Sequence, residues 1–256
     1  MDNQEQNPRL NQIPTQWSVV RQAHGDDSVQ GNQAREALLE RYGGAIYRYL
    51  LGALRNVEAA EELSQEFACR FLNGSLRGAD PTRGRFRDYV KGVLYHLVVD
   101  YQRKQRRANS LGSDLPEPGE ECSLAAERDR AFLEAWRDEI LARTWIRLEE
   151  VDRQQGQHYF TVLRYRAEHP DQSSSEMAQA LTQLLAKPIS AEAGRQTLKR
   201  ARDRFTQLML EEVAQGQDSA TTESVTAELI DLGLYEYCRS SLERRGRAAE
   251  GNDVST

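Results

Sequence analysis

The stretch GRFRDYVKGVLYHLVVDYQRKQRR, residues 84–107, decides how the chain is interpreted. Its apolar side chains recur every three or four residues, which predicts one amphipathic α-helix from Phe86 to about Arg107. The stretch has seven Lys or Arg, two Asp and four aromatic rings, a net charge of +5 in a chain whose net charge is -6. Binding responds to local charge rather than to the total, so this cationic, aromatic helix favours a nucleic-acid partner over a merely solvated basic face.

The rest of the sequence has the same helical periodicity and no pattern typical of strands. With 256 residues, 39% of them hydrophobic, the chain is long enough for one large or two small cores. We therefore expect an all-α protein with two helical domains. No apolar run is long enough to span a membrane and the N-terminal residues are polar, so we expect a cytoplasmic protein without a signal peptide.

The cysteines and histidines indicate neither disulfides nor a metal site. Cys69, Cys122 and Cys238 lie more than fifty residues apart, and the four histidines are scattered. This spacing fits neither a disulfide framework nor a zinc site. A buried, inert role is expected for each cysteine.

Three helices make up the expected first domain, residues 17–108, after a disordered N-terminus over 1–16. Gly43 and Gly44 interrupt the first helix and each costs about 1 kcal/mol relative to alanine, so a kink or a break is expected there. The second helix should bury one leucine and two phenylalanines and end at Asn73. The expected helices span 32–54, 58–72 and 86–107, and the side chains buried by the second are Leu63, Phe67 and Phe71.

A linker over residues 109–123 separates the two expected domains, since it is rich in Pro, Gly, Ser and acidic residues. The second domain, 124–245, begins with one or two helices that should bury Trp136 and Trp145. Residues 246–256 are expected to be a disordered tail.

The second domain also contains two helices joined by a short turn. Ser173 and Glu176 form a capping-box pattern at the start of the first helix, and Ser190 suits the N-cap of the second. Such a pair resembles a helix-turn-helix, whose second helix reads the major groove, although an ordinary helical hairpin has the same pattern. A final amphipathic segment, 223–245, should pack on this domain. The inward stripe of the second helix is Leu198, Ala201, Phe205, Leu208 and Met209, and that of the final segment is Val225, Leu229, Leu232, Leu234 and Tyr237.

Side chains on the outer faces of these helices are suited to bind DNA. In the helix after Phe86, we expect Arg87, Lys91 and Tyr95 to project away from the apolar stripe, which places a ring among cations. Asp100 has ion-pair spacing to His96 and is expected to be structural. In the second domain, glutamine and basic side chains that suit base edges point outward at positions 196, 199 and 200, with arginines at 195 and 202 beside them.

The helix over 58–72 has the opposite charge. Glu58, Glu61, Glu62 and Glu66 face one cation, Arg70. An acidic face of this kind suits a basic protein surface, although a simply solvated helix is the commoner case.

No catalytic motif is present. A phosphate-binding GxxxxGK[ST], a GxGxxG after a strand and an HExxH are all missing, so we expect no enzyme activity.

Three motifs in this order are similar to those of a bacterial RNA polymerase sigma factor of the extracytoplasmic-function type, in the subgroup with a short C-terminal extension. AAEELSQEFACRFL, residues 59–72, resembles the family's helix that binds core polymerase. FRDYVKGVLYHLVVDYQRK, residues 86–104, resembles its promoter-melting helix, with Tyr89 where tryptophan is usual and His96 where asparagine is usual. RQTLKRARDRFTQLMLEEV, residues 195–213, resembles its helix that reads the minus-thirty-five element.

The resemblance implies a sigma factor that directs core polymerase to promoters and assists strand opening. Its partners would be core polymerase and promoter DNA, with an anti-sigma factor as a further candidate, and no cofactor is implied. The implied residues are Glu61, Glu62, Gln65 and Glu66 for polymerase; Arg85, Arg87, Lys91, Tyr95, His96, Arg103, Lys104, Arg106 and Arg107 for the minus-ten element; and Arg195, Gln196, Lys199, Arg200 and Arg202 for the minus-thirty-five element.

Two other functions remain open at this stage. A stand-alone helix-turn-helix regulator would bind operators without polymerase, and the acidic helix would then have no role. A nuclease or RNA-processing enzyme would use Asp80, Asp88 or Asp100 and would require a metal ion.

Overall fold

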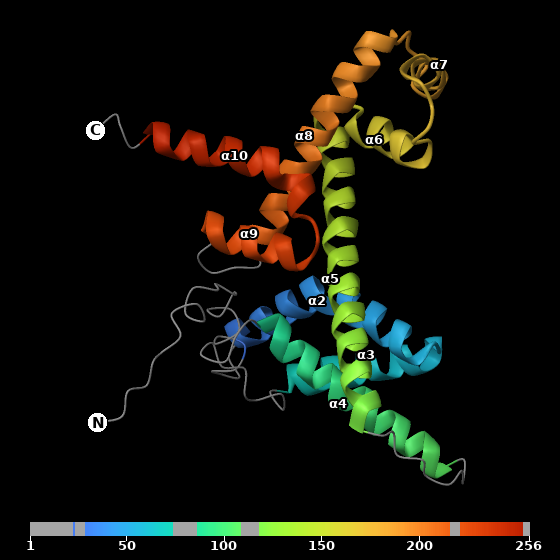
Figure 1. The fold of residues 1–256 in the computed structure, drawn as a ribbon, viewed down its shortest axis with the longest axis vertical. Helices are drawn as coiled ribbons and strands as arrows, with labels where there is room; N and C mark the ends of the chain where they lie inside the picture. Colours follow the sequence, from blue (N-terminus) through green and yellow to red (C-terminus); the bar gives the residue numbers. More distant parts are fainter. Residues whose placement is uncertain (1–22, 24–28, 74–85, 109–117, 216–220, 253–256) are drawn as a thin grey trace. The chain divides into compact units, whose positions relative to one another are not determined.

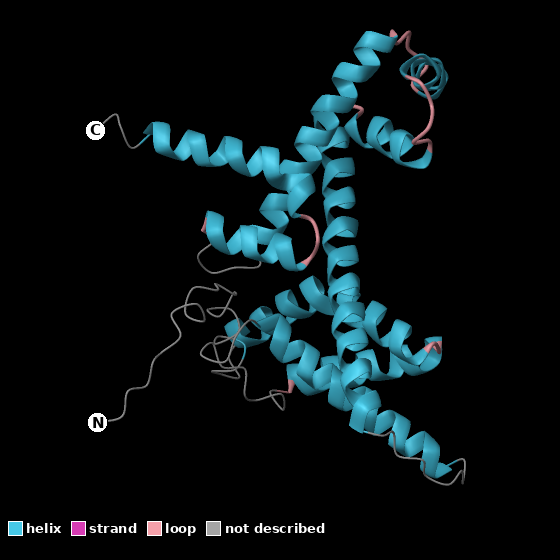
Figure 2. Ribbon diagram, in the orientation of Figure 1, coloured by secondary structure: helices cyan, strands magenta, loops and turns pink. Residues whose placement is uncertain are grey.

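The computed structural model describes residues 23, 29–73, 86–108, 118–215 and 221–252 (Figure 1). These residues form helices and short connections and contain no strand, so the predicted all-α class is confirmed (Figure 2). The predicted termini 1–16 and the first part of the linker, 109–117, lie outside the described residues.

The helices group into two compact units. The first unit comprises the described residues up to Glu139 together with those in Gln215–Leu232, and the second comprises those in Ile140–Ala214 and from Gly233 onward. We predicted that residues 124–139 and the segment after Thr222 belong to the second domain. In the structure, residues 124–139 belong to the first unit, and so does the C-terminal segment up to Leu232.

The first unit contains α2 (Val29–Leu54), α3 (Val57–Leu72), α4 (Phe86–Ala108), the first half of α5 (Pro118–Gln155) and α9 (Thr222–Asp231). Aromatic rings form much of its core. Tyr42 of α2 stacks on Trp136 of α5 with 4.7 Å between ring centroids, and lies 5.3 Å from Phe86 of α4. The predicted burial of Leu63, Phe67 and Phe71 is confirmed.

Helix α2 runs without a break through its two adjacent glycines, so the predicted break is absent. The carboxylate of Glu139 lies where a Cβ of Gly44 would stand, and it pairs with Arg48 one turn further along α2. Glycine at this position thus allows a side chain of α5 to approach the α2 backbone. Its cost in helix propensity is offset by this packing.

Helix α5 is one continuous helix of 38 residues, with no break at the predicted boundary between residues 123 and 124. The predicted linker residues 118–123 are therefore helical. Trp136 is buried as predicted, and Trp145 is partly buried against Phe160 and Phe205.

The second unit contains the rest of α5, α6 (Tyr159–Glu168), α7 (Ser174–Leu184), α8 (Ala191–Gln215) up to Ala214, and α10 (Tyr235–Asn252). Helix α6 was not predicted from the sequence. Glu212 of α8 is buried and accepts a hydrogen bond from Arg143 of α5 at 2.7 Å, with Arg147 at 3.6 Å. Two cations from successive turns of α5 thus balance one buried carboxylate.

The C-terminal segment forms two helices rather than one. Gly233, with a φ of +68°, separates α9 from α10, and most residue types would be strained in this conformation. Tyr237 contacts Phe205 of the second unit as predicted, although it is 47% exposed, and the other four predicted apolar positions of the segment are buried. Helix α10 also extends to Asn252, beyond the predicted start of the tail at residue 246.

Candidate nucleic-acid interface

Helix α4 has an exposed C-terminal half with the composition of a nucleic-acid surface. Tyr95 is 39% exposed and its ring meets that of His96 edge to face, with 5.5 Å between centroids. Further along, Arg103, Lys104 and Arg107 are exposed. Rings and cations that are both accessible on one helix can stack on bases and neutralise phosphates.

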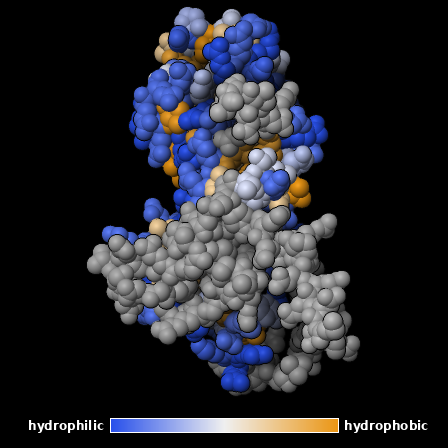
Figure 3. All heavy atoms as spheres, turned by 90° about the vertical axis from the view of Figure 1, so that its left-hand side faces the viewer, coloured by the Kyte–Doolittle hydropathy of each residue, from blue (hydrophilic) through white to orange (hydrophobic). Residues whose placement is uncertain are grey.

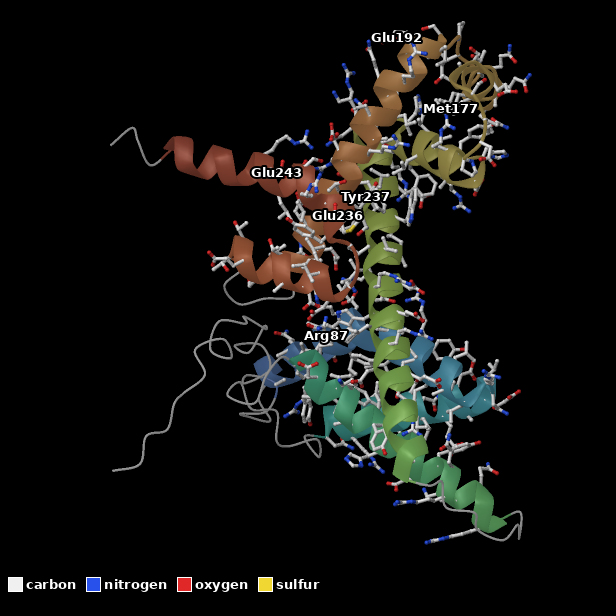
Figure 4. All side chains as sticks on the ribbon, in the orientation of Figure 1. Arg87, Met177, Glu192, Glu236, Tyr237 and Glu243 are labelled. Carbon is white, nitrogen blue, oxygen red and sulfur yellow. The ribbon has the colours of Figure 1, made fainter. Side chains whose placement is uncertain are left out.

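The N-terminal half of α4 is different, because Arg87 is buried with only 6% of its surface exposed (Figure 4). Its guanidinium pairs with Glu228 and Asp231 of α9 in the same unit. The prediction that Arg87 projects outward is therefore wrong. Arg87 lies seven residues before the buried Leu94, which is two helical turns, so the two side chains share a face.

Residues of α5 cover the middle of α4. Lys91 pairs with Asp129, with 3.2 Å between Nζ and Oδ1, and the guanidinium of Arg128 lies 5.1 Å from the centre of the Tyr95 ring. Asp129 thus already neutralises Lys91, and Arg128 already covers part of the Tyr95 ring. Of the other two predicted cations, Arg85 lies outside the described residues and only the backbone of Arg106 is described.

Helix α3 presents the acidic face that the sequence predicts. Asn56 caps it, with its side chain accepting a hydrogen bond from the backbone N–H of Ala59 at 2.8 Å. The side chains of Glu61, Glu62 and Gln65 are exposed, and Glu66 is partly buried and pairs with Arg70 one turn later.

The acidic face of α3 and the basic end of α4 line the same groove, which has a volume of about 470 Å³. Acidic side chains line one wall and mainly basic side chains the other. A partner could therefore contact both helices at once. The charged lining residues are Glu62, Glu66 and Arg70 from α3 and Asp100, Arg103, Lys104 and Arg107 from α4.

Cys69, on the same helix α3, is exposed, so the expectation that every cysteine is buried is wrong for this one. Cys238 is fully buried as predicted, with its Sγ 3.7 Å from Sδ of Met209. Burial raises the pKa of the Cys238 thiol to about 11.

Helices α7 and α8 form the predicted pair in the second unit. The capping box of Ser173 and Glu176 is present, and the backbone N–H of Ala193 donates to Oγ of Ser190 at 3.1 Å. Thr182, which was not predicted from the sequence, stabilises the turn between α7 and α8. Its Oγ1 donates a hydrogen bond to the carbonyl of Ala178 and accepts one from the backbone N–H of Ile189. The predicted inward stripe of α8 is buried at all five positions.

The outer face of α8 is exposed at each predicted contact residue, namely Arg195, Gln196, Lys199, Arg200 and Arg202. Two of them are engaged near the helix start: Arg195 pairs with Glu192, and Gln196 Nε2 donates to Glu192 Oε1 at 3.1 Å (Figure 4). The hydrogen bonds from Arg195 and Gln196 lower the pKa of Glu192. The cationic face therefore lies at Lys199, Arg200 and Arg202.

An aromatic groove of about 500 Å³ in the second unit was not predicted. Trp145, Phe205 and Tyr237 line it, and Tyr237 contacts Phe205 edge to face with 6.2 Å between centroids. Burial raises the pKa of the Tyr237 hydroxyl, although the residue is partly exposed.

Outside the grey residues, the face of the molecule in Figure 3 is mainly hydrophilic, with apolar side chains between the polar ones.

The described residues contain neither a metal-binding cluster nor a membrane-spanning helix. No group of three or more His, Cys, Asp or Glu side chains among them could hold a metal ion. None of the described helices is both long and apolar enough to cross a membrane.

Comparison with known families gives one match. No curated protein and no solved structure matches the chain significantly. Residues 38–108, which contain most of α2 and all of α3 and α4, match the family model described as Sigma-70 region 2. The match covers 71 of 256 residues, the part that carries the acidic face and the basic helix. The chain therefore contains a sigma-70 region 2 domain, which supports its assignment to the sigma factors.

Proposed function

We propose that the protein is an RNA polymerase sigma factor of the extracytoplasmic-function type, which acts in the cytoplasm to direct core polymerase to promoters and to assist strand opening. The match of residues 38–108 to sigma-70 region 2 is the observation that carries this proposal. The protein itself would supply promoter choice, and the polymerase would supply catalysis.

The acidic face of α3 would bind core polymerase. Glu61, Glu62 and Gln65 are exposed together on a helix whose other face is buried, so their carboxylates and amide can meet a basic protein surface without rearrangement. Opposite charge across such an interface steers association and fixes its register.

The exposed half of α4 would bind the minus-ten element. Tyr95 and His96 can stack on unpaired bases, while Arg103, Lys104 and Arg107 neutralise phosphates of the separated strand. Stacking contributes roughly 1 to 3 kcal/mol per base, which can offset the few kcal/mol that unstacking a base costs.

The outer face of α8 would bind the minus-thirty-five element. The cations of this face, Lys199, Arg200 and Arg202, are exposed. The turn before α8 is stabilised by the capping box of α7 and by the hydrogen bond from Ile189 to Thr182, so α8 would present these cations to the DNA major groove from a fixed position. Arginine and glutamine are the side-chain types that read guanine and adenine edges, and Gln196 would exchange its hydrogen bond to Glu192 for one to a base.

Reconstitution with purified core polymerase tests the proposal. The full-length chain should co-elute with core polymerase and render promoter thymines reactive to permanganate. A variant with Glu61, Glu62 and Gln65 replaced by alanine should lose co-elution, whereas a control with the exposed Glu149 and Glu150 of α5 replaced should keep it. Tight duplex binding by the chain alone, together with no polymerase binding, would contradict the proposal.

A stand-alone helix-turn-helix regulator is the second candidate. The exposed basic face of α8 favours it equally well, because that face would also suit an operator. It predicts that the alanine variant on α3 binds its DNA as the unchanged chain does, and that added polymerase has no effect.

A further inference from the structure

The guanidinium of Arg87 is buried in the first unit, where it pairs with the carboxylates of Glu228 and Asp231. Its Nη2 lies 3.0 Å from Oδ2 of Asp231, and its Nη1 contacts Oε1 of Glu228. Only 13% of the Glu228 side chain is exposed, against 41% for Asp231. The third nitrogen, Nε, is buried and has no hydrogen-bond partner in the part of the chain that the structure describes. A guanidinium this buried needs its acidic partners to remain charged.

Helix α9 is built to present these acids. The capping box of Thr221 and Ser224 starts the helix, and Val225 and Leu229 are buried. Glu228 and Asp231 lie three residues apart in its last turn, on one edge beside this apolar face. Docking of α9 thus combines buried apolar surface with two charges rather than depending on one exposed ion pair.

The charges of Arg87, Glu228 and Asp231 each oppose the dipole of their own helix, but they attract one another across the contact between α4 and α9. Arg87 lies in the first turn of α4, where the helix dipole already places partial positive charge, and both acids lie in the last turn of α9, where that charge is negative. Contact between the basic start of α4 and the acidic end of α9 removes both penalties. The charge pattern of the two helices is therefore complementary.

We propose that α9 is an acidic partner of α4 within the same chain, and that its carboxylates occupy Arg87 in the place of nucleic-acid phosphates. While α9 is docked, the first turn of α4 cannot contact DNA, and only the exposed half from Tyr95 onward can. This inference deepens the proposed function and rests on it for the identity of the competing ligand. The docking of α9 itself does not depend on that function.

Hydrogen exchange tests the docking. In the full-length chain, Glu228→Gln with Asp231→Asn leaves a buried cation without its balancing charges. We expect amide exchange in α9 and in α4 from Val90 to Leu97 to accelerate at least tenfold, because both depend on the contact. Glu223→Gln, an exposed acid in the first turn of the same helix, is the matched control and should leave exchange unchanged. Faster exchange in α9 alone, or in neither helix, overturns the proposal.

A third substitution protects this test against simple unfolding of the variant. Adding Arg87→Met removes the buried cation and should restore slow exchange, because replacing buried ion groups with apolar side chains of similar size is often tolerated. If slow exchange does not return in this triple variant, the three charges do not act as a unit and the proposal fails.

DNA binding tests the competition. With core polymerase and a fluorescein-labelled promoter fragment, the Glu228→Gln, Asp231→Asn chain should bind at least threefold more tightly than the unchanged chain, and adding Arg87→Met should abolish the gain. Equal affinities would overturn the competition. If neither chain binds polymerase or the promoter fragment, the proposed function fails, while the exchange measurement still decides whether α9 docks on α4.

Discussion

Charge burial is the strongest constraint at the scale of single residues. Arg87, with 6% of its surface exposed, is held by the two acids of α9. Removing one side of a buried ion pair costs more than the pair itself contributes, because the remaining charge is left without compensation. Arg87→Ala should therefore lower the free energy of unfolding by about 3 kcal/mol. Urea unfolding followed by circular dichroism measures this loss.

The exposed pair of Arg195 and Glu192 is the control for that measurement. Its two side chains are more than half exposed, and surface pairs of this kind contribute about 0 to 1 kcal/mol. Arg195→Ala should thus have little effect on unfolding. Similar losses for both variants would mean that the burial of Arg87 has no energetic consequence.

Cys238 should make stability depend on alkaline pH. Burial raises its pKa to about 11 from the 9.0 of an unperturbed thiol, so the folded state binds the thiol proton more tightly than the unfolded state does. Below about pH 9 both states keep the proton and the thiol has no effect. Between about pH 9 and 11 only the unfolded state loses it, so stability falls as pH rises, by at most about 3 kcal/mol.

Cys238→Ala is the comparison for this prediction. Its unfolding free energy, measured from pH 8 to 11, should fall less steeply than that of the unchanged chain, because the other titrating groups are the same in both. Parallel pH profiles would exclude a buried thiol as the cause. Cys69, which is exposed, should react with a thiol reagent in the folded chain while Cys238 does not.

Among the elements, α4 divides into two halves with different electrostatic roles. Lys91 is 33% exposed and paired with Asp129, whereas Arg103 is 70% exposed and lies 3.9 Å from Asp100, which is 63% exposed. A cation that is already neutralised in the protein releases fewer counterions when DNA binds. Arg103→Ala and Lys104→Ala should each reduce the slope of log affinity against log salt by about one.

Lys91→Ala provides the contrast on the same helix. It should change the slope by less than half as much, since Asp129 already neutralises Lys91 within the chain. The slopes come from fluorescence anisotropy of the polymerase complex on a promoter fragment over a salt series. Equal reductions for all three variants would show that the two halves of α4 contact DNA alike.

Long helices with a regular apolar period were the elements that the sequence could predict. Helices α3 and α4 begin and end within a few residues of the prediction, because each has a run of apolar positions that leaves one choice of face. Helix α6 was missed: it has ten residues, and its buried side chains, Val162 and Leu163, are adjacent and show no period.

The candidate site could be predicted only where exposure follows from the helix itself. The outer face of α8 and the acidic face of α3 depend on local spacing and are exposed as predicted. The burial of Arg87 depends on acids 141 and 144 residues away in sequence. Local periodicity contains no information on such a pairing, although the shared face with Leu94 was a sign that Arg87 borders the core.

At the scale of the whole molecule, the C-terminal segment is part of both units rather than an appendage. Helix α9 belongs to the first unit and buries Leu229, whereas α10 belongs to the second and buries Cys238 and Leu242. Each fully buried apolar side chain contributes roughly 1.5 to 3 kcal/mol. A chain that ends at residue 220 should thus lose stability in both units.

Truncation at two positions tests this arrangement. A chain that ends after residue 220 should melt about 10 °C or more below the full-length chain, since a loss of 1 kcal/mol shifts the melting temperature by about 2 to 4 °C in a protein of this size. A chain that ends after Arg244 keeps α9 and the buried Cys238 and Leu242 of α10, so its melting temperature should stay within a few degrees of the original. Hydrogen exchange of the shorter truncation should accelerate in α4 as well as in α8, because α9 packs in the unit of the former and α10 in that of the latter. Acceleration in α8 alone would mean that α9 contributes nothing to the first unit.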